Sequence, residues 1–194
     1  MPTRTMVATA IAVQCCSVFA AGLIANEDAS RPTQGQPTTA GALCQSIGPQ
    51  SSEQTPVDLY KSLTACINKG DYETAVENFG LAGAYGKFDS MRVTDQSAHQ
   101  VIAVLRQAAL MSAIPANRAE FQKLAGATYD DKSRHASLCS RVAASGPPSY
   151  FPKYMLLHGL DAVPGSNSSG GGMVPSFDQT LAWRKALSAY LNCE

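Results

Sequence analysis

Residues 66–86, CINKGDYETAVENFGLAGAYG, decide the fold of this chain. Gly70 can end one helix, because glycine adopts the left-handed backbone conformation at little cost. Asp71 follows directly and is typical of a residue that caps the start of the next helix. The apolar positions after it recur at helical spacing, at Tyr72, Ala75, Val76, Phe79 and Ala82 or Gly83. The stretch therefore predicts two helices joined by a very short loop.

The first of these two helices has a clear predicted start. Thr55-Pro56-Val57-Asp58 places a capping threonine before a proline at the first helical position, with an acid three residues after the cap. One helical face follows, at Val57, Tyr60, Leu63, Thr64 and Ile67. Because the loop is so short, we expect the two helices to form an antiparallel αα-hairpin.

The rest of the chain also favours helices. They are expected from Thr94 or Asp95 to Ala113, over 117–125, 132–143 and 154–158, and from a capping-box pattern at Ser176 through Leu191. The first of them is apolar nearly all round, which predicts a central and buried position. No stretch shows convincing alternation with a period of two. The predicted fold is all-α, a compact multi-helix domain stapled by two disulfides.

Length and charge limit the classes of function. A chain of 194 residues with 45% hydrophobic residues can bury a substantial core. Only 15% of the residues are charged, against roughly 25% in a typical soluble domain. The 15 basic and 15 acidic side chains balance, and no basic run occurs. A nucleic-acid partner is therefore not expected.

The amino terminus is typical of an export signal. Arg4 precedes a mostly apolar stretch and then small residues, which predicts a signal peptide over residues 1–20 with cleavage after Ala20. The apolar stretch is too short to span a bilayer comfortably, so no stable membrane insertion is expected after its removal. Residues 21–54 are polar and predict a disordered linker ahead of a helical domain over 55–194. The expected location is periplasmic or secreted.

Four cysteines remain after the predicted cleavage, at Cys44, Cys66, Cys139 and Cys193. An even number of cysteines in an exported chain predicts two disulfides, for which three pairings are possible. The pairing Cys44–Cys66 with Cys139–Cys193 is favoured because each bridge joins a loop or tail to a predicted helix. No CxxC motif occurs and no histidine stands at ligand spacing, so neither a metal nor a cofactor is expected.

The predicted hairpin resembles a single tetratricopeptide repeat and the related Sel1-type repeat. Leu59, Leu63, Gly70-Asp71-Tyr72, Ala75, Phe79 and Ala82 carry the resemblance, which covers only residues 57–86. Three further stretches, TPVDLYKSL, LAGAYGKFDS and SAHQ, resemble exported proteins of Gram-negative bacteria. That group includes small periplasmic immunity proteins. The resemblance implies a helical protein that binds another protein.

Two functions of different class are compatible with the sequence. The leading hypothesis is a non-catalytic domain that binds another protein, as an immunity protein or inhibitor. Its predicted binding residues are Tyr72, Glu73, Asn78, Tyr85 and Phe88 on the hairpin, and Tyr150 and Tyr154 in an aromatic turn. The alternative is a small hydrolase of the cell envelope that uses His99 with Asp95 or Asp131.

Overall fold

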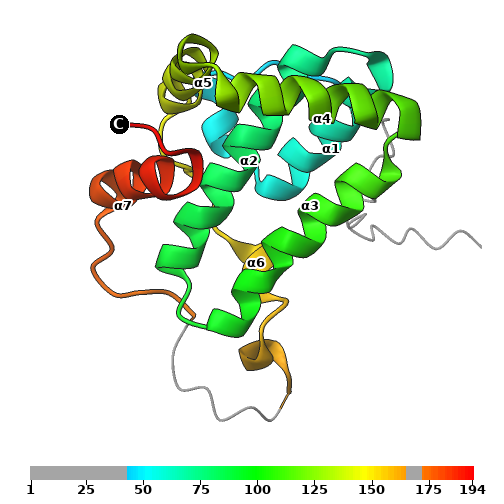
Figure 1. The fold of residues 1–194 in the computed structure, drawn as a ribbon. Helices are drawn as coiled ribbons and strands as arrows, with labels where there is room; N and C mark the ends of the chain where they lie inside the picture. Colours follow the sequence, from blue (N-terminus) through cyan, green and yellow to red (C-terminus); the bar gives the residue numbers. More distant parts are fainter. Residues whose placement is uncertain (1–42, 165–171) are drawn as a thin grey trace, which may run out of the picture. The chain divides into compact units, whose positions relative to one another are not determined.

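The computed structural model describes residues 43–164 and 172–194, in which every named secondary-structure element is a helix or helical turn (Figure 1). The α-helices are α1 (Pro56–Lys69), α2 (Tyr72–Arg92), α3 (Val101–Ser112), α4 (Pro115–Asp130), α5 (Lys132–Ala144), α6 (Lys153–Leu156) and α7 (Gln179–Ala186). Short 3-10 turns are η1 (Pro49–Glu53), η2 (Gln96–Gln100) and η3 (Leu160–Ala162), and the π-helical turn η4 (Leu187–Leu191) extends α7. The all-α prediction is confirmed. The predicted signal peptide and most of the predicted linker lie outside the described residues.

The hairpin of α1 and α2 forms with the predicted caps. Thr55 and Asp58 make a reciprocal capping box at the start of α1. Gly70 ends α1 with φ 82°, and the side chain of Asp71 accepts a hydrogen bond from the amide of Thr74 at the start of α2. The two helices pack closely against each other. The local signals in residues 66–86 therefore determine this part of the backbone.

Helix α2, and not α3, occupies the centre of the domain. Thirteen residues of α2 are buried, and the helix contacts α1, α4, α5 and α7 (Figure 1). In α3 only Val101 and Ala109 are buried. The prediction of a buried central helix ending at Ala113 was therefore wrong, because the apolar character of a helix does not decide which helix its neighbours cover.

Glycines on α2 explain why other elements of the domain can pack so closely around this helix. A methyl group on Gly83 would overlap the ring of Tyr190, and a methyl group on Gly86 would lie 2.7 Å from the side chain of Ile102. The sequence GLAGAYG therefore presents backbone where a larger residue would hold η4 and α3 away. The close approach is what makes α2 the core helix.

Both predicted disulfides, Cys44–Cys66 and Cys139–Cys193, are present. The first ties the segment before α1 to the last turn of α1. The second ties α5 to the penultimate residue of the chain. Each bridge therefore joins a tail to a helix, as the sequence indicated.

Two predicted boundaries differ from the structure. Residues 43–54 carry η1 and pack against α1, where the amide of Gln45 donates to the hydroxyl of Ser62, so ordered structure begins before Thr55. The final helix is capped by Asp178, whose side chain accepts from the amide of Leu181, and not by Ser176. Ser176 has φ 53°, a left-handed conformation that does not lead into a helix.

Candidate functional site

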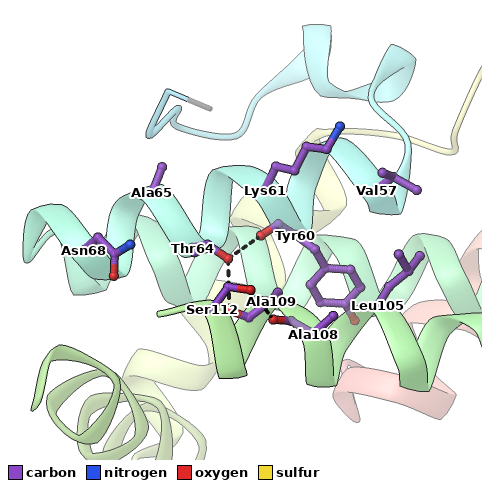
Figure 2. Close-up of a pocket in the computed structure, with 10 residues that line it drawn as sticks. All are labelled: Val57, Tyr60, Lys61, Thr64, Ala65, Asn68, Leu105, Ala108, Ala109 and Ser112. Atoms are coloured by element: carbon purple, nitrogen blue, oxygen red, sulfur yellow. Dashed lines mark hydrogen bonds between the residues drawn. The ribbon is translucent and has the colours of Figure 1, made fainter. Parts of the chain in front are cut away.

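A groove lined mainly by apolar side chains lies between α1 and α3. Its volume is about 430 Å³. It is lined by Val57, Tyr60, Lys61, Thr64, Ala65 and Asn68 from α1 and by Leu105, Ala108, Ala109 and Ser112 from α3 (Figure 2). We call this the α1–α3 groove.

Two side chains of α1 fix the shape of the groove. The ring of Tyr60 points toward Leu105 and Ala108 and is only 2% exposed, so it fills the space between the helices (Figure 2). The hydroxyl of Thr64 lies 3.1 Å from the carbonyl oxygen of Tyr60 and 3.0 Å from that of Ala109. This hydroxyl therefore links the two helices that form the walls of the groove.

The outer face of α3 continues the apolar surface beyond the groove. Val104, Ala108 and Met111 follow at helical spacing, and Val104 is 64% and Met111 68% exposed. Ile114, just after α3, is 50% exposed. Single exposed apolar residues are ordinary on protein surfaces, whereas a contiguous patch marks a place where another molecule binds. We call Val104, Ala108 and Met111 the α3 stripe.

The charges beside this apolar surface are positive. Lys61 is the charged residue among those that line the α1–α3 groove. On the other flank of α3, a second hollow of about 420 Å³ is lined by Arg106 and Arg118 together with Gln107, Gln122, Ala103, Leu110 and Met111. No Asp or Glu is among the described residues that line either hollow. The surface is therefore apolar along α3 and basic at its edges.

Three of the predicted binding residues are in the core, so the prediction that they bind a partner was wrong. Asn78 is 1% exposed, and its side-chain amide donates to the carbonyl oxygens of Gln45 and Thr74. Tyr85 and Phe88 are completely buried. These side chains share the inward face of α2, where they connect the hairpin to the rest of the domain.

The remaining hairpin residues reach the surface but do not form a site. Glu73 is exposed in the first turn of α2, where a negative charge is favourable beside the helix amino terminus. Tyr72 is half-buried against the core. Neither residue lines a hollow among those described for this part of the chain.

Tyr150 and Tyr154 point inward, toward a buried carboxylate. Their hydroxyls donate to Oδ2 of Asp89 at 2.8 Å and 2.6 Å. Arg92 Nε donates to Oδ1 of the same residue at 2.8 Å, and the guanidinium group lies over the rings of Phe88 and Tyr150. The aromatic turn is therefore an internal contact of the domain and does not present these hydroxyls to a partner.

The protonation of this cluster follows from its burial. Desolvation raises the pKa of Asp89, and Arg92 and the two tyrosine hydroxyls act in the opposite direction. Burial and the neighbouring carboxylate also raise the pKa of Tyr150 and Tyr154 above the ordinary value, so both hydroxyls keep their protons and donate. The arrangement stabilises one packing of α6 and the preceding turn against α2.

The residues of the predicted hydrolase have other partners. His99 Nε2 is 2.9 Å from the carbonyl oxygen of Val93, whereas Asp95 caps η2 through Ser97. Asp131 caps α5 by accepting from the amide of Arg134. Within residues 43–164 and 172–194, neither carboxylate is hydrogen bonded to His99. The geometry does not assemble the predicted acid–base pair.

Three further observations bear on function. Among the described residues, no group of three His, Cys, Asp or Glu side chains is arranged to hold a metal ion. None of the described helices combines the length and the apolar character needed to cross a membrane. Comparison with protein families, with curated proteins and with solved structures finds no match for this chain.

The sequence contains one signal for the α3 surface. Residues 101–111 are almost free of charge, with Arg106 as the exception. An apolar helix can be buried by its own domain or covered by a partner, and the sequence pattern is the same in both cases. Only the position of α3 at the edge of the domain separates the two.

Proposed function

We propose that this chain is an exported, non-catalytic domain that binds another protein through the α1–α3 groove and the α3 stripe. An immunity or inhibitor role is the most specific form of this proposal. The observation that carries it is the row of exposed apolar side chains at helical spacing along α3, with Val104 64% and Met111 68% exposed. An exposed apolar surface of this kind is typical of a site where another protein binds and covers it.

The shape and charge of the surface favour a particular kind of partner segment. An amphipathic helix lays apolar side chains one turn apart into a groove between two helices. The apolar stripe Val104, Ala108 and Met111 has the same repeat. Lys61, Arg106 and Arg118 at its edges favour acidic residues on either side of the partner's apolar face. The proposed partner segment is therefore an acidic amphipathic helix.

Export is supported by the cysteines and the amino-terminal sequence. Disulfides persist in oxidising compartments and are rare in the cytosol. Both bridges close in the described part of the chain. The resemblance of the hairpin to a tetratricopeptide or Sel1-type repeat is in keeping with a protein-binding role and remains part of the proposal.

Site-specific photo-crosslinking tests the binding surface. A photoreactive residue at Val104 or Met111, in the full chain expressed in a Gram-negative host, is expected to crosslink to one and the same protein. Ala108→Glu places a negative charge and extra volume at the edge of the groove and is expected to abolish this product. Ala119→Glu, at an exposed alanine of α4, is the matched control and should leave it unchanged.

The outcome that contradicts the binding surface is a crosslinked product that forms equally in both alanine variants. Export is tested separately by the mass of the purified protein. Removal of residues 1–20 and the absence of free thiols in the mature chain are expected. A retained amino terminus, or cysteines that react with a thiol reagent without prior reduction, would contradict export.

A further inference from the structure

A third hollow, distinct from the α1–α3 groove and from the hollow beside Arg118, lies where α2, η2, the start of α3 and Tyr190 meet. Its volume is about 240 Å³. Gly83 and Gly86 of α2 contribute only backbone to its wall, while the ring of Tyr190 packs on Gly83 and Ile102 packs on Gly86. We call this hollow the basic pocket.

The charged and titratable side chains that line the basic pocket carry no negative charge at neutral pH. Lys87, His99 and Arg106 line it from three different elements, together with the hydroxyl groups of Ser90 and Tyr190. No Asp or Glu is among the described residues that line it. In the described part of the chain the ion pairs are Arg92–Asp89 and Arg141–Glu77, so neither Lys87 nor Arg106 is neutralised by an acid.

The lining groups differ in what they offer an anion. The carbonyl oxygen of Val93 accepts from Nε2 of His99 at 2.9 Å, so in the neutral ring Nδ1 is an acceptor and adds no donor. Burial raises the pKa of Tyr190, so its hydroxyl keeps a proton to donate. The hydroxyl of Ser90 already donates to the carbonyl oxygen of Gly86 at 2.9 Å and adds no donor.

The backbone adds a contribution of the same sign. Ile102 and Ala103 line the pocket from the first turn of α3, a helix of 12 residues. The amino-terminal end of a helix carries a partial positive charge and favours anions. The helix end is not the basis of the site, which rests on the cationic side chains and the pocket itself, but it acts in the same direction.

We propose that the basic pocket binds a small oxyanion of the phosphate class. A guanidinium group can make two parallel hydrogen bonds to phosphate oxygens, and a lysine ammonium adds a point charge. The fixed charges of Lys87 and Arg106 match a phosphate dianion better than a single carboxylate. Free phosphate and the phosphate group of a small organic ester share this chemistry. This inference does not depend on the proposed protein-binding function.

Isothermal titration calorimetry of the full oxidised chain, at constant ionic strength, tests binding to the basic pocket. Sodium phosphate, phenyl phosphate and sodium acetate are the three probes, with chloride as the balancing salt. Saturable binding of phosphate is expected, with weaker binding of acetate. Tighter binding of phenyl phosphate than of phosphate would identify an organic ester as the ligand, and equal binding would identify free phosphate.

Variants locate the site. Lys87→Gln and Arg106→Gln are each expected to weaken phosphate binding at least tenfold, whereas Lys123→Gln, an exposed lysine of α4, should leave it unchanged. Lys87 is exposed, so its variant tests the site without disturbing packing. Phosphate binding that is absent, that acetate equals, or that survives in both Lys87→Gln and Arg106→Gln would overturn the proposal.

Discussion

Replacing Tyr154 by Phe tests the buried polar cluster around Asp89. The change keeps the aromatic ring and removes one hydroxyl, whose oxygen lies 2.6 Å from Oδ2 of a carboxylate that is completely buried. A hydrogen bond to a charged group contributes about 1.5–3 kcal/mol. We therefore expect the free energy of unfolding to fall by about 1.5–3 kcal/mol at neutral pH. A domain of this size has about 5–15 kcal/mol in total, so the loss is large.

Urea unfolding followed by fluorescence measures this loss. Trp183 is the single tryptophan of the chain, and its ring centroid lies 5.5 Å from that of Tyr85 and 6.5 Å from that of Phe88. Its emission therefore reports on the packing beside the cluster. Tyr72→Phe is the matched control, because the hydroxyl of Tyr72 has no hydrogen bond to any described residue. Its expected change is within about 0.5 kcal/mol.

The effect of pH on this loss has a defined sign. The Tyr154 hydroxyl stabilises the ionised form of Asp89 and so lowers its pKa, which means that Tyr154→Phe leaves a folded state with a higher pKa at Asp89. The stability that the hydroxyl contributes is present while Asp89 is ionised and is lost as the pH falls through that pKa. Because burial raises the pKa of Asp89, the loss begins above the ordinary carboxyl value of about 3.9.

A double-mutant cycle with Asp89→Asn isolates the interaction. In the Asp89→Asn background the charged acceptor is absent, and we expect Tyr154→Phe to cost less than about 0.5 kcal/mol. A cost of Tyr154→Phe that is the same in both backgrounds, or the same at acidic and neutral pH, would refute the reasoning. The hydroxyl would then act through packing and not through the carboxylate.

Three further predictions concern the glycines of α2, the disulfides and the cap of α1. Gly83→Ala should destabilise the domain by about 1–3 kcal/mol, because the added methyl forces away the ring of Tyr190. Gly80→Ala should stabilise the domain by about 0.5–1 kcal/mol, because its added methyl meets its nearest neighbour at 3.5 Å. Thermal unfolding of the two variants distinguishes these outcomes. A mild reductant should open Cys139–Cys193 before Cys44–Cys66, because both cysteines of the former line hollows whereas Cys66 is completely buried. Alkylation and mass spectrometry follow the order, and simultaneous opening would contradict this prediction. Thr55→Ala should cost about 1 kcal/mol in urea unfolding through loss of the capping box at α1, and an unchanged midpoint would mean that the cap is dispensable.

Much of the candidate site could not be predicted from the sequence, because the residues that line it are far apart along the chain. Thr64 and Ala109, which are joined by a hydrogen bond across the groove, are 45 residues apart. The same is true of the buried cluster, where Tyr154 meets Asp89 over 65 residues. Aromatic residues are typical of binding surfaces and equally typical of cores. This is true of Tyr85, Phe88, Tyr150 and Tyr154. Residue type alone does not separate these two roles.

The sequence by itself determined the elements of this protein whose physics is local. Thr55, Gly70 and Asp71 set the limits of the hairpin through caps and a left-handed turn, and the helical repeat of apolar residues set the all-α class. The tertiary structure alone decided that α2 is covered and that α3 is left open. The reason is that burial is a competition among helices for the same core, and Gly83 and Gly86 of α2 let Tyr190 and Ile102 pack directly against its backbone.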